Sequence, residues 1–433
     1  MKKIVSQYSS FLLGVAVIFS ACKKDYGNLN SPTVQQFSSN ATQSQLNNLV
    51  SGTESAMRNN LALYLDDVAT IGREGYRFSA SEPRYVTDLL GAANAKLSNS
   101  NFYITNTWAS RYQVIKNCNI LISAATNSAL ITAGQKKGYT GFAKTIKAYQ
   151  LLLNLNLTDS NGIRVDVADP NNLGPIVGYD DALAAIANLL DEGNSDLTGA
   201  AVSFTLSGFG NLGDATGLSQ VNRALAARVA IYRQKWADAL TALNGSFFGL
   251  NKDFYLGINH VFGTGSGDQL NPVFIPQNQN GEVRVAHPSF AADIEAGDDR
   301  INKATLRTSA ASLNGLSSNR DVWVYTSSTA PAAIIRNEEL VLIYAEANIQ
   351  IGNFGEGIKA INVIRQGHGI AAYAGAVTST ALITEVLKQR RYSLFFEGHR
   401  WIDLRRYKIL NTLPIDRVGD DIWSEFPLPV TEQ

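Results

Sequence analysis

Residues 335–365 read IRNEELVLIYAEANIQIGNFGEGIKAINVIR, and this stretch decides the fold. Apolar residues recur at three- and four-residue intervals from 337 to 351, which predicts an amphipathic helix. Gly352-Asn353 interrupts this pattern, and a second helix is predicted from about 355 to 366. Two short helices joined by a turn that contains glycine form a helical hairpin.

A second hairpin with a similar turn lies earlier in the chain. Trp236 is followed three positions on by Ala239, just as Phe354 is followed by Gly357. An aromatic residue and then a small one at this spacing resemble a tetratricopeptide repeat, in which the small residue lets two helices approach closely. We therefore expect an all-α, tetratricopeptide-like solenoid of helical hairpins, with a loop-rich region and minor β structure.

Further helices and long loops complete the expected architecture. Residues 107–125 and 140–157 predict another hairpin, with Trp108 and Cys118 in its core, and Ser219 can cap a helix that runs to Tyr232. Long stretches rich in Gly, Asn and Ser separate the helices, and ordered loops of this length are often functional. These stretches are 159–179, 206–218 and 245–281, and residues 321–327 predict a short strand.

The N-terminus carries the features of an exported lipoprotein. Lys2 and Lys3 precede an apolar run at 11–19, which is shorter than the about 20 residues that span a bilayer. Small residues stand directly before Cys22, as in a lipobox, where the cysteine is acylated (palmitate is the expected lipid) and becomes the mature N-terminus. An ordinary signal peptide followed by an incidental cysteine is the alternative. The expected organisation is a signal peptide at 1–21, a flexible tether at 22–40 and a single domain at 41–433.

The composition excludes several classes of protein. Lysine plus arginine number 37 and aspartate plus glutamate number 37, so no net charge draws the chain to nucleic acid or anionic lipid. If Cys22 carries lipid, Cys118 has no partner within the chain, which excludes a disulfide framework. The four histidines are scattered and lack metal-ligand spacing, so we expect neither a metal nor a cofactor.

Three motifs resemble the SusD/RagB family of outer-membrane lipoproteins. The segment 335–365 resembles the family's YAEA helix, glycine turn and second helix ending in Asn-x-x-Arg. Residues 390–406 (RRYSLFFEGHRWIDLRR) resemble the signature near the family's C-terminus, and the closing residues 426–429 (FPLP) are similar to its Pro-hydrophobic-Pro motif. The matching signature residues are Glu397, Gly398, Arg400, Trp401, Asp403 and Leu404.

The resemblance implies a function. A member of this family is a lipid-anchored protein of the outer membrane, exposed at the cell surface, that catalyses nothing. It captures a glycan or other oligomeric nutrient and passes it to a partner TonB-dependent transporter of the SusC type. Gln389 and Ser393 stand where the family usually has glutamate, and the chain is short for the family, which implies reduced variable loops.

Two other interpretations of the function remain open. A surface glycoside hydrolase needs two carboxylates across a cleft, and the sequence alone leaves that arrangement possible. A purely structural surface protein is the third interpretation. Residues 208–213 spell G-x-G-x-x-G, but the next helix is expected only near Ser219 and no parallel-sheet pattern surrounds the motif, which argues against a dinucleotide site.

A candidate ligand site lies in the segment 73–85 (REGYRFSASEPRY), which combines aromatic residues and arginines and lacks helical periodicity. An aromatic ring can cover the apolar face of a sugar, while arginine donates to its hydroxyls. Alternatively, these side chains pack the loop onto the helices, with the arginines paired to Glu74 and Glu82. The candidate ligand-binding residues are Arg73, Tyr76, Arg77, Phe78, Tyr85 and Trp323.

The C-terminal signature has a structural interpretation. Arg390 lies on the core side of a predicted helix, where Glu397, Arg400 and Asp403 can form ion pairs and cap neighbouring backbone. Arginine's planar fork suits buried pairing with carboxylates, so we favour a structural ion-pair network of these residues. Trp401 belongs to the same structural signature. An anion-binding site is the alternative.

Overall fold

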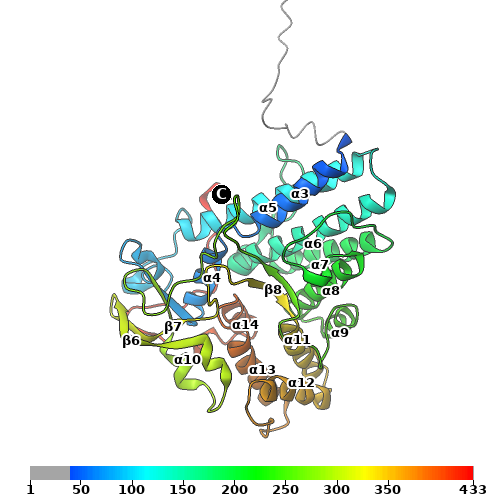
Figure 1. The fold of residues 1–433 in the computed structure, drawn as a ribbon. Coiled ribbons are helices and arrows are strands. Elements are labelled where there is room, and N and C mark those ends of the chain that lie inside the picture. Colours follow the sequence, from blue (N-terminus) through cyan, green and yellow to red (C-terminus); the bar gives the residue numbers. More distant parts are fainter. Residues whose placement is uncertain (1–39, 433) are drawn as a thin grey trace, which may run out of the picture.

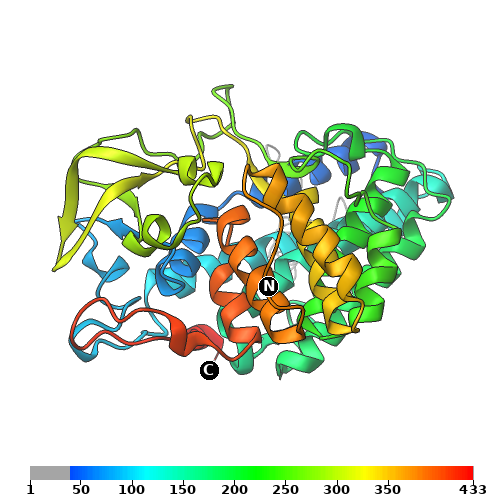
Figure 2. The ribbon, with the colours of Figure 1, turned by 90° about the horizontal axis from the view of Figure 1, so that it is seen from below.

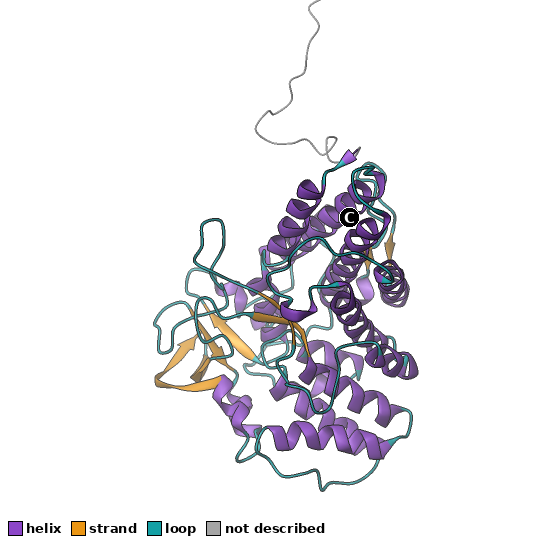
Figure 3. Ribbon diagram, turned by 45° about the vertical axis from the view of Figure 1, so that its right-hand side comes forward, coloured by secondary structure: helices purple, strands orange, loops and turns teal. Residues whose placement is uncertain are grey.

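The computed structural model describes residues 40–432 of the chain. The predicted signal peptide, Cys22 and the tether up to residue 39 therefore lie outside the described residues. Helices form most of the molecule, and strands gather mainly on one side of it (Figure 3). The predicted helix-rich fold with minor β structure is thus confirmed. Among residues 40–432, no helix has both the length and the apolar character needed to cross a membrane.

The helices fall into an N-terminal run and a C-terminal group, and the chain between them holds five of the strands and one short helix. The N-terminal run is α3 (Gln43–Ala56), α4 (Leu61–Ile71), α5 (Phe102–Asn127), α6 (Ala133–Thr158), α7 (Tyr179–Leu197), α8 (Ala215–Tyr232) and α9 (Trp236–Asn244). The short helix is α10 (Pro288–Asp293), and the C-terminal group is α11 (Asn337–Gln350), α12 (Phe354–Gly367), α13 (Ser379–Ser393) and α14 (Arg400–Arg406).

The predicted hairpins are present, although some helices are longer than expected. α11 and α12 match the predicted pair 337–351 and 355–366. α6 begins earlier than predicted because Thr132 and Gln135 form a capping box at its start. The helix expected from Ser219 begins at Ala215, because the Asp214 side chain accepts a hydrogen bond from the Gly217 N–H.

The helices pack mainly against their neighbours in sequence. α5, α6, α7, α8 and α9 follow one another as a stack, and α11 packs against α12, α13 and α9 (Figure 1). Small residues permit this close packing: a Cβ on Gly357 would lie 2.5 Å from Ile349 Cγ1, and one on Gly141 would lie 2.6 Å from Leu197 Cγ. Cys118 is fully buried on α5, and burial raises the pKa of its thiol to about 12.

A four-stranded antiparallel sheet has the order β1-β5-β7-β6. The prediction of a strand at 321–327 is wrong for residues 323–327. β7 ends at Val322, and these residues form a loop. Figure 2 shows β6 and β7 at one side, α6–α9 at the other and α11–α14 between them. The strands of this sheet are β1 (Gly75–Phe78), β5 (Val283–Ala286), β6 (Ala304–Leu313) and β7 (Leu316–Val322). The two smaller antiparallel pairs are β2 (Ile163–Arg164) with β3 (Ile176–Val177), and β4 (Gly257–His260) with β8 (Ala332–Arg336).

The glycine-rich motif at 208–213 has a structural explanation. A helix does begin soon after it, at Ala215, so the expectation that none opens there is wrong. However, Gly208 packs against β4, where an added Cβ would lie 1.8 Å from the Asn259 carbonyl oxygen. The motif therefore permits a close backbone contact with an antiparallel strand pair and does not follow a parallel strand.

Candidate functional site

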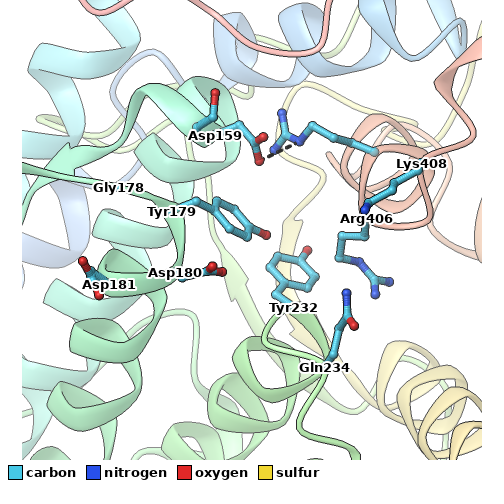
Figure 4. A pocket seen from close by; sticks show the side chains of 11 residues that line it. Asp159, Gly178, Tyr179, Asp180, Asp181, Tyr232, Gln234, Arg406 and Lys408 are labelled. Carbon is cyan, nitrogen blue, oxygen red and sulfur yellow. Dashed lines mark ion pairs between the residues drawn. The ribbon is translucent and has the colours of Figure 1, made fainter.

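Four helices meet around an open cavity of about 630 Å³ (Figure 4). The ends of α6, α8 and α14 and the start of α7 form its walls, so residues far apart in sequence lie together. Cavities of 300–1,000 Å³ are typical of small-molecule sites. We call it the Tyr179 cavity; its lining residues are Asp159, Ser160, Gly178, Tyr179, Asp180, Asp181, Tyr232, Gln234, Arg405, Arg406 and Lys408.

Three of the helices end at this cavity at a residue with positive φ that is not glycine, although the ψ of −116° at Asp159 lies outside the left-handed helical region. The residues concerned are Asp159 (φ 42°), Gln234 (φ 56°) and Lys408 (φ 57°), all on the cavity wall. Left-handed residues often terminate helices, but glycine usually takes the position because other side chains are strained there. Strained residues that cluster around one cavity suggest that their side chains are needed there.

The guanidinium groups of the cavity are held in fixed positions. Arg405 Nε lies 3.0 Å from Asp159 Oδ1 and its guanidinium stacks over Trp401, 4.6 Å from the ring centroid. Arg406 lies 2.8 Å from both Glu346 and Asp403. Burial raises the pKa of Asp159 above its usual value even though Arg405 opposes this shift. The wall thus presents charges whose positions are set before any ligand arrives.

Two tyrosines supply the aromatic part of the site. Both rings project into the cavity in Figure 4. Burial raises the pKa of Tyr179 and of Tyr232, so both phenols stay neutral and can donate hydrogen bonds. Within residues 40–432, neither hydroxyl has a hydrogen-bond partner, and neither is shut off from solvent. These hydroxyls are therefore available to a ligand.

The arrangement suits a polyhydroxylated ligand. Aromatic rings contact the apolar faces of a sugar, while phenols, amides and charged groups bond to its hydroxyls. Gln234, Asp180 and Lys408 are exposed on the rim, where they add an amide, a carboxylate and an ammonium. The one partly buried carboxylate, Asp159, is already paired with Arg405.

The predicted ligand segment is part of the core rather than a loop on the surface. Tyr76 and Phe78 are each 2% exposed and point from β1 into the small core under the sheet, with ring centroids 5.6 Å apart. Arg73 is fully buried and donates to the Asp421 carbonyl oxygen at 2.8 Å. Tyr76 and Phe78 alternate with residues on the other face of the strand, and this two-residue period is the strand signal that the sequence analysis missed. A ligand cannot reach these three side chains in this conformation.

The other candidate ligand residues are partly exposed but lie outside the Tyr179 cavity. Arg77 pairs with Glu282 at 3.0 Å, and the ring of Tyr85 packs edge-on against Phe102. Trp323 lies across from Phe274, with ring centroids 6.0 Å apart. No residue of the six candidates lines the cavity.

The signature residues form buried contacts that join different parts of the chain. Glu397 accepts two hydrogen bonds from Arg336, at 2.9 and 3.0 Å, and Asp403 contacts both Arg390 and Arg406. The Arg400 side chain donates to the Gly72 carbonyl oxygen, and burial lowers the pKa of Arg400 to about 10. Trp401 is fully buried and donates to the Trp423 carbonyl oxygen at 2.8 Å.

Sequence reasoning missed the cavity residues because they come from separate helix ends. One useful signal is the length of the loop 159–179, which favours a functional role, and both of its end residues line the cavity. Arg405 lies within the signature 390–406, but that motif was interpreted as structural, and Tyr232 carries no local signal that distinguishes it from an ordinary residue in the last turn of a helix.

Comparisons with known proteins identify both a domain match and a fold match. Residues 296–418 match the model of the SusD family. A SusD superfamily protein from Bacteroides vulgatus is similar, with a TM-score of 0.67 and 15% identity over 90% of this chain and 96% of that chain. One from Bacteroides thetaiotaomicron has a TM-score of 0.68 and 16% identity over 90% and 97%. Surface glycan-binding protein A from Bacteroides uniformis has a TM-score of 0.63 and 15% identity over 86% and 90%. No curated protein matches the chain.

Proposed function

From the match of residues 296–418 to the SusD family and the fold shared with SusD superfamily proteins, we propose that the chain is a SusD/RagB-type surface protein that binds a glycan or other oligomeric nutrient and catalyses nothing. The observation that carries this proposal is the Tyr179 cavity, where two neutral tyrosine hydroxyls, neither hydrogen-bonded to any residue in 40–432, face fixed charged groups. A glycan-binding protein of the same fold supports the choice of ligand class. A chain end or a short stretch of a longer glycan fits a cavity of this volume.

The binding experiment starts with a panel of soluble polysaccharides in native affinity gels. The polysaccharide that retards the protein is then cut into oligosaccharides for calorimetry. Tyr179→Ala should weaken binding about tenfold, because it removes both the ring contact and the hydroxyl. Tyr179→Phe should weaken it less, since only one hydrogen bond is lost.

The matched control is Tyr255→Ala, which removes a tyrosine that is 72% exposed and lies outside the cavity. It should leave the affinity unchanged. Equal affinity of wild type and Tyr179→Ala, with unchanged melting temperatures, would move the glycan site away from this cavity.

The remaining parts of the proposal concern the cell surface. We infer that Cys22 carries lipid and anchors the protein to the outer membrane, and that a TonB-dependent transporter of the SusC type receives the nutrient. In the same proposal, the stacked hairpins are tetratricopeptide-like repeats. Labelling with a radioactive fatty acid tests the anchor: wild type should be labelled and Cys22→Ala should not. Co-purification of a transporter with tagged protein from the native membrane tests the partner.

A glycoside hydrolase remains the alternative function. The cavity contains Asp159 and Asp180, but Arg405 already holds Asp159, which disfavours its use as a catalytic acid. Prolonged incubation with the bound oligosaccharide should return it intact in chromatography. Shortened products that disappear in Asp159→Asn would favour the hydrolase instead.

A further inference from the structure

A second hollow, of about 500 Å³, lies beside α5 and shares no lining residue with the Tyr179 cavity. We call it the α5 hollow. The side of α5 forms one wall, and the loop after β2 together with the end of the described chain forms the other. Its lining is mostly apolar: the side chains that matter below are Trp108, Tyr112, Ile120, Val167 and Leu173, with Lys116 at the edge.

The polar atoms around the α5 hollow are already bonded to one another. Trp108 Nε1 donates to Glu432 Oε1 at 3.2 Å, and the Tyr112 hydroxyl donates to the Arg164 carbonyl oxygen at 2.7 Å. Arg164 Nε lies 2.6 Å from Glu432 Oε2. Because these groups are satisfied, the hollow offers a ligand apolar contact rather than hydrogen bonds. In this respect it differs from the Tyr179 cavity.

Lys116 is the one charged group of the lining without a partner in residues 40–432. It is exposed and has no hydrogen bond or ion pair with any residue in 40–432. It follows Tyr112 by four positions on α5, so both side chains lie on the same face of the helix. The ammonium group thus stands at the edge of an apolar hollow without an anion beside it.

We propose that the α5 hollow binds a small amphipathic carboxylate, with an aromatic ring or short alkyl chain inside and the acid group at Lys116. The apolar lining stabilises the body of such a ligand, and the free ammonium selects the charge at its end. Leu173 is 47% exposed and would be covered by the ligand. The inference does not rest on the proposed glycan function, since it uses none of the same residues.

Two probes with the same carbon skeleton test the proposal on the full chain in detergent. They are trans-cinnamate and its neutral analogue cinnamyl alcohol, measured by calorimetry and by saturation-transfer NMR. We expect both to bind, with cinnamate tighter by about two- to fivefold, because a partly exposed ion pair adds only a little to the affinity. Failure of both probes to bind would overturn the proposal.

Two substitutions separate the apolar and the charged contribution. Ala109 is exposed on α5 and lines the hollow, so Ala109→Phe should fill the space without disturbing the core and reduce the binding of both probes at least tenfold. Lys116→Gln should lower the affinity for cinnamate to that for cinnamyl alcohol. It should leave the affinity for cinnamyl alcohol unchanged. An unchanged preference for cinnamate in Lys116→Gln would contradict the role of the charge.

The controls are matched in chemistry and position. Ala237→Phe adds the same ring at an exposed helix position on α9, and Lys96→Gln removes an exposed lysine that lines neither the α5 hollow nor the Tyr179 cavity. Both should bind the probes like wild type. Tyr179→Ala should do so as well, and a weaker cinnamate affinity in that variant would place the probe in the Tyr179 cavity and overturn the assignment.

Discussion

The stack α5–α9 and the junction around α11 and α14 are stabilised by different interactions. In the stack, apolar faces and small residues such as Gly141 allow helices to pack closely. At the junction, buried arginines bind buried carboxylates: Arg228 pairs with Glu339 and Arg390 with Asp403, each at 2.6 Å. Apolar packing tolerates small changes in geometry. Removal of one partner of a buried ion pair, in contrast, leaves a buried charge without compensation and destabilises the fold.

The largest expected effect is at the junction. Asp403→Ala leaves Arg390 and Arg406 without one of their carboxylate partners, and we expect it to lower the free energy of unfolding by about 3–5 kcal/mol. Urea unfolding measures the change. The matched control is Asp191→Ala, which breaks an exposed pair with Arg223 and should change stability by less than about 1 kcal/mol. Equal effects of the two substitutions would remove the contrast between junction and surface.

The second expected effect is a pH dependence at the same junction. Glu74 is buried, and burial raises its pKa from 4.5 to about 8, so the folded protein keeps a proton that the unfolded chain has released. Stability from this group is complete below pH 4.5 and is lost as the pH rises through about 8. Glu74→Gln should remove this loss and be more stable than wild type at pH 8, by about 2–4 kcal/mol.

Urea unfolding at several pH values between 5 and 8 tests this prediction. Wild type should lose stability across the range, and Glu74→Gln should follow a flatter curve. Parallel curves for the two proteins would show that Glu74 is ionised in the folded state.

A smaller effect is expected in the hairpin of α11 and α12, where helix packing is close. Gly357→Ala places a Cβ 2.5 Å from Ile349 Cγ1, so it should lower stability by about 1–3 kcal/mol. Gly355→Ala lies in the same helix with no atom within 4 Å, and should raise stability by up to about 1 kcal/mol through helix propensity. Thermal melts compare the two variants directly. An unchanged melting temperature in Gly357→Ala would mean that the contact between Gly357 and Ile349 has room for a methyl group.

The smallest expected effect is at an apolar position that is already exposed. Ile351 is 50% exposed at the end of α11, and Ile351→Ala should change stability by less than about 0.5 kcal/mol. A thermal melt measures the shift. A clear loss would indicate that the hairpin has an apolar partner surface in the full chain.

The sequence was sufficient for the helical hairpins and insufficient for the sheet and the cavity. The pattern at 337–366 predicted α11 and α12 because long helices repeat their apolar face over several turns. The sequence does not predict the strand that holds Tyr76 and Phe78, because a four-residue strand offers only two alternations. The Tyr179 cavity could not be predicted, since it depends on where four helices end in space.

The burial of Cys118 has a practical consequence for following ligand capture in real time. A thiol that is enclosed in α5 and ionises only near pH 12 does not react with maleimides at neutral pH. A cysteine that replaces the exposed Ser160, a nearly isosteric change, would then be the only reactive thiol in residues 40–432. A fluorophore attached there stands on the rim of the Tyr179 cavity and would report the arrival and departure of a glycan without any other alteration of the protein.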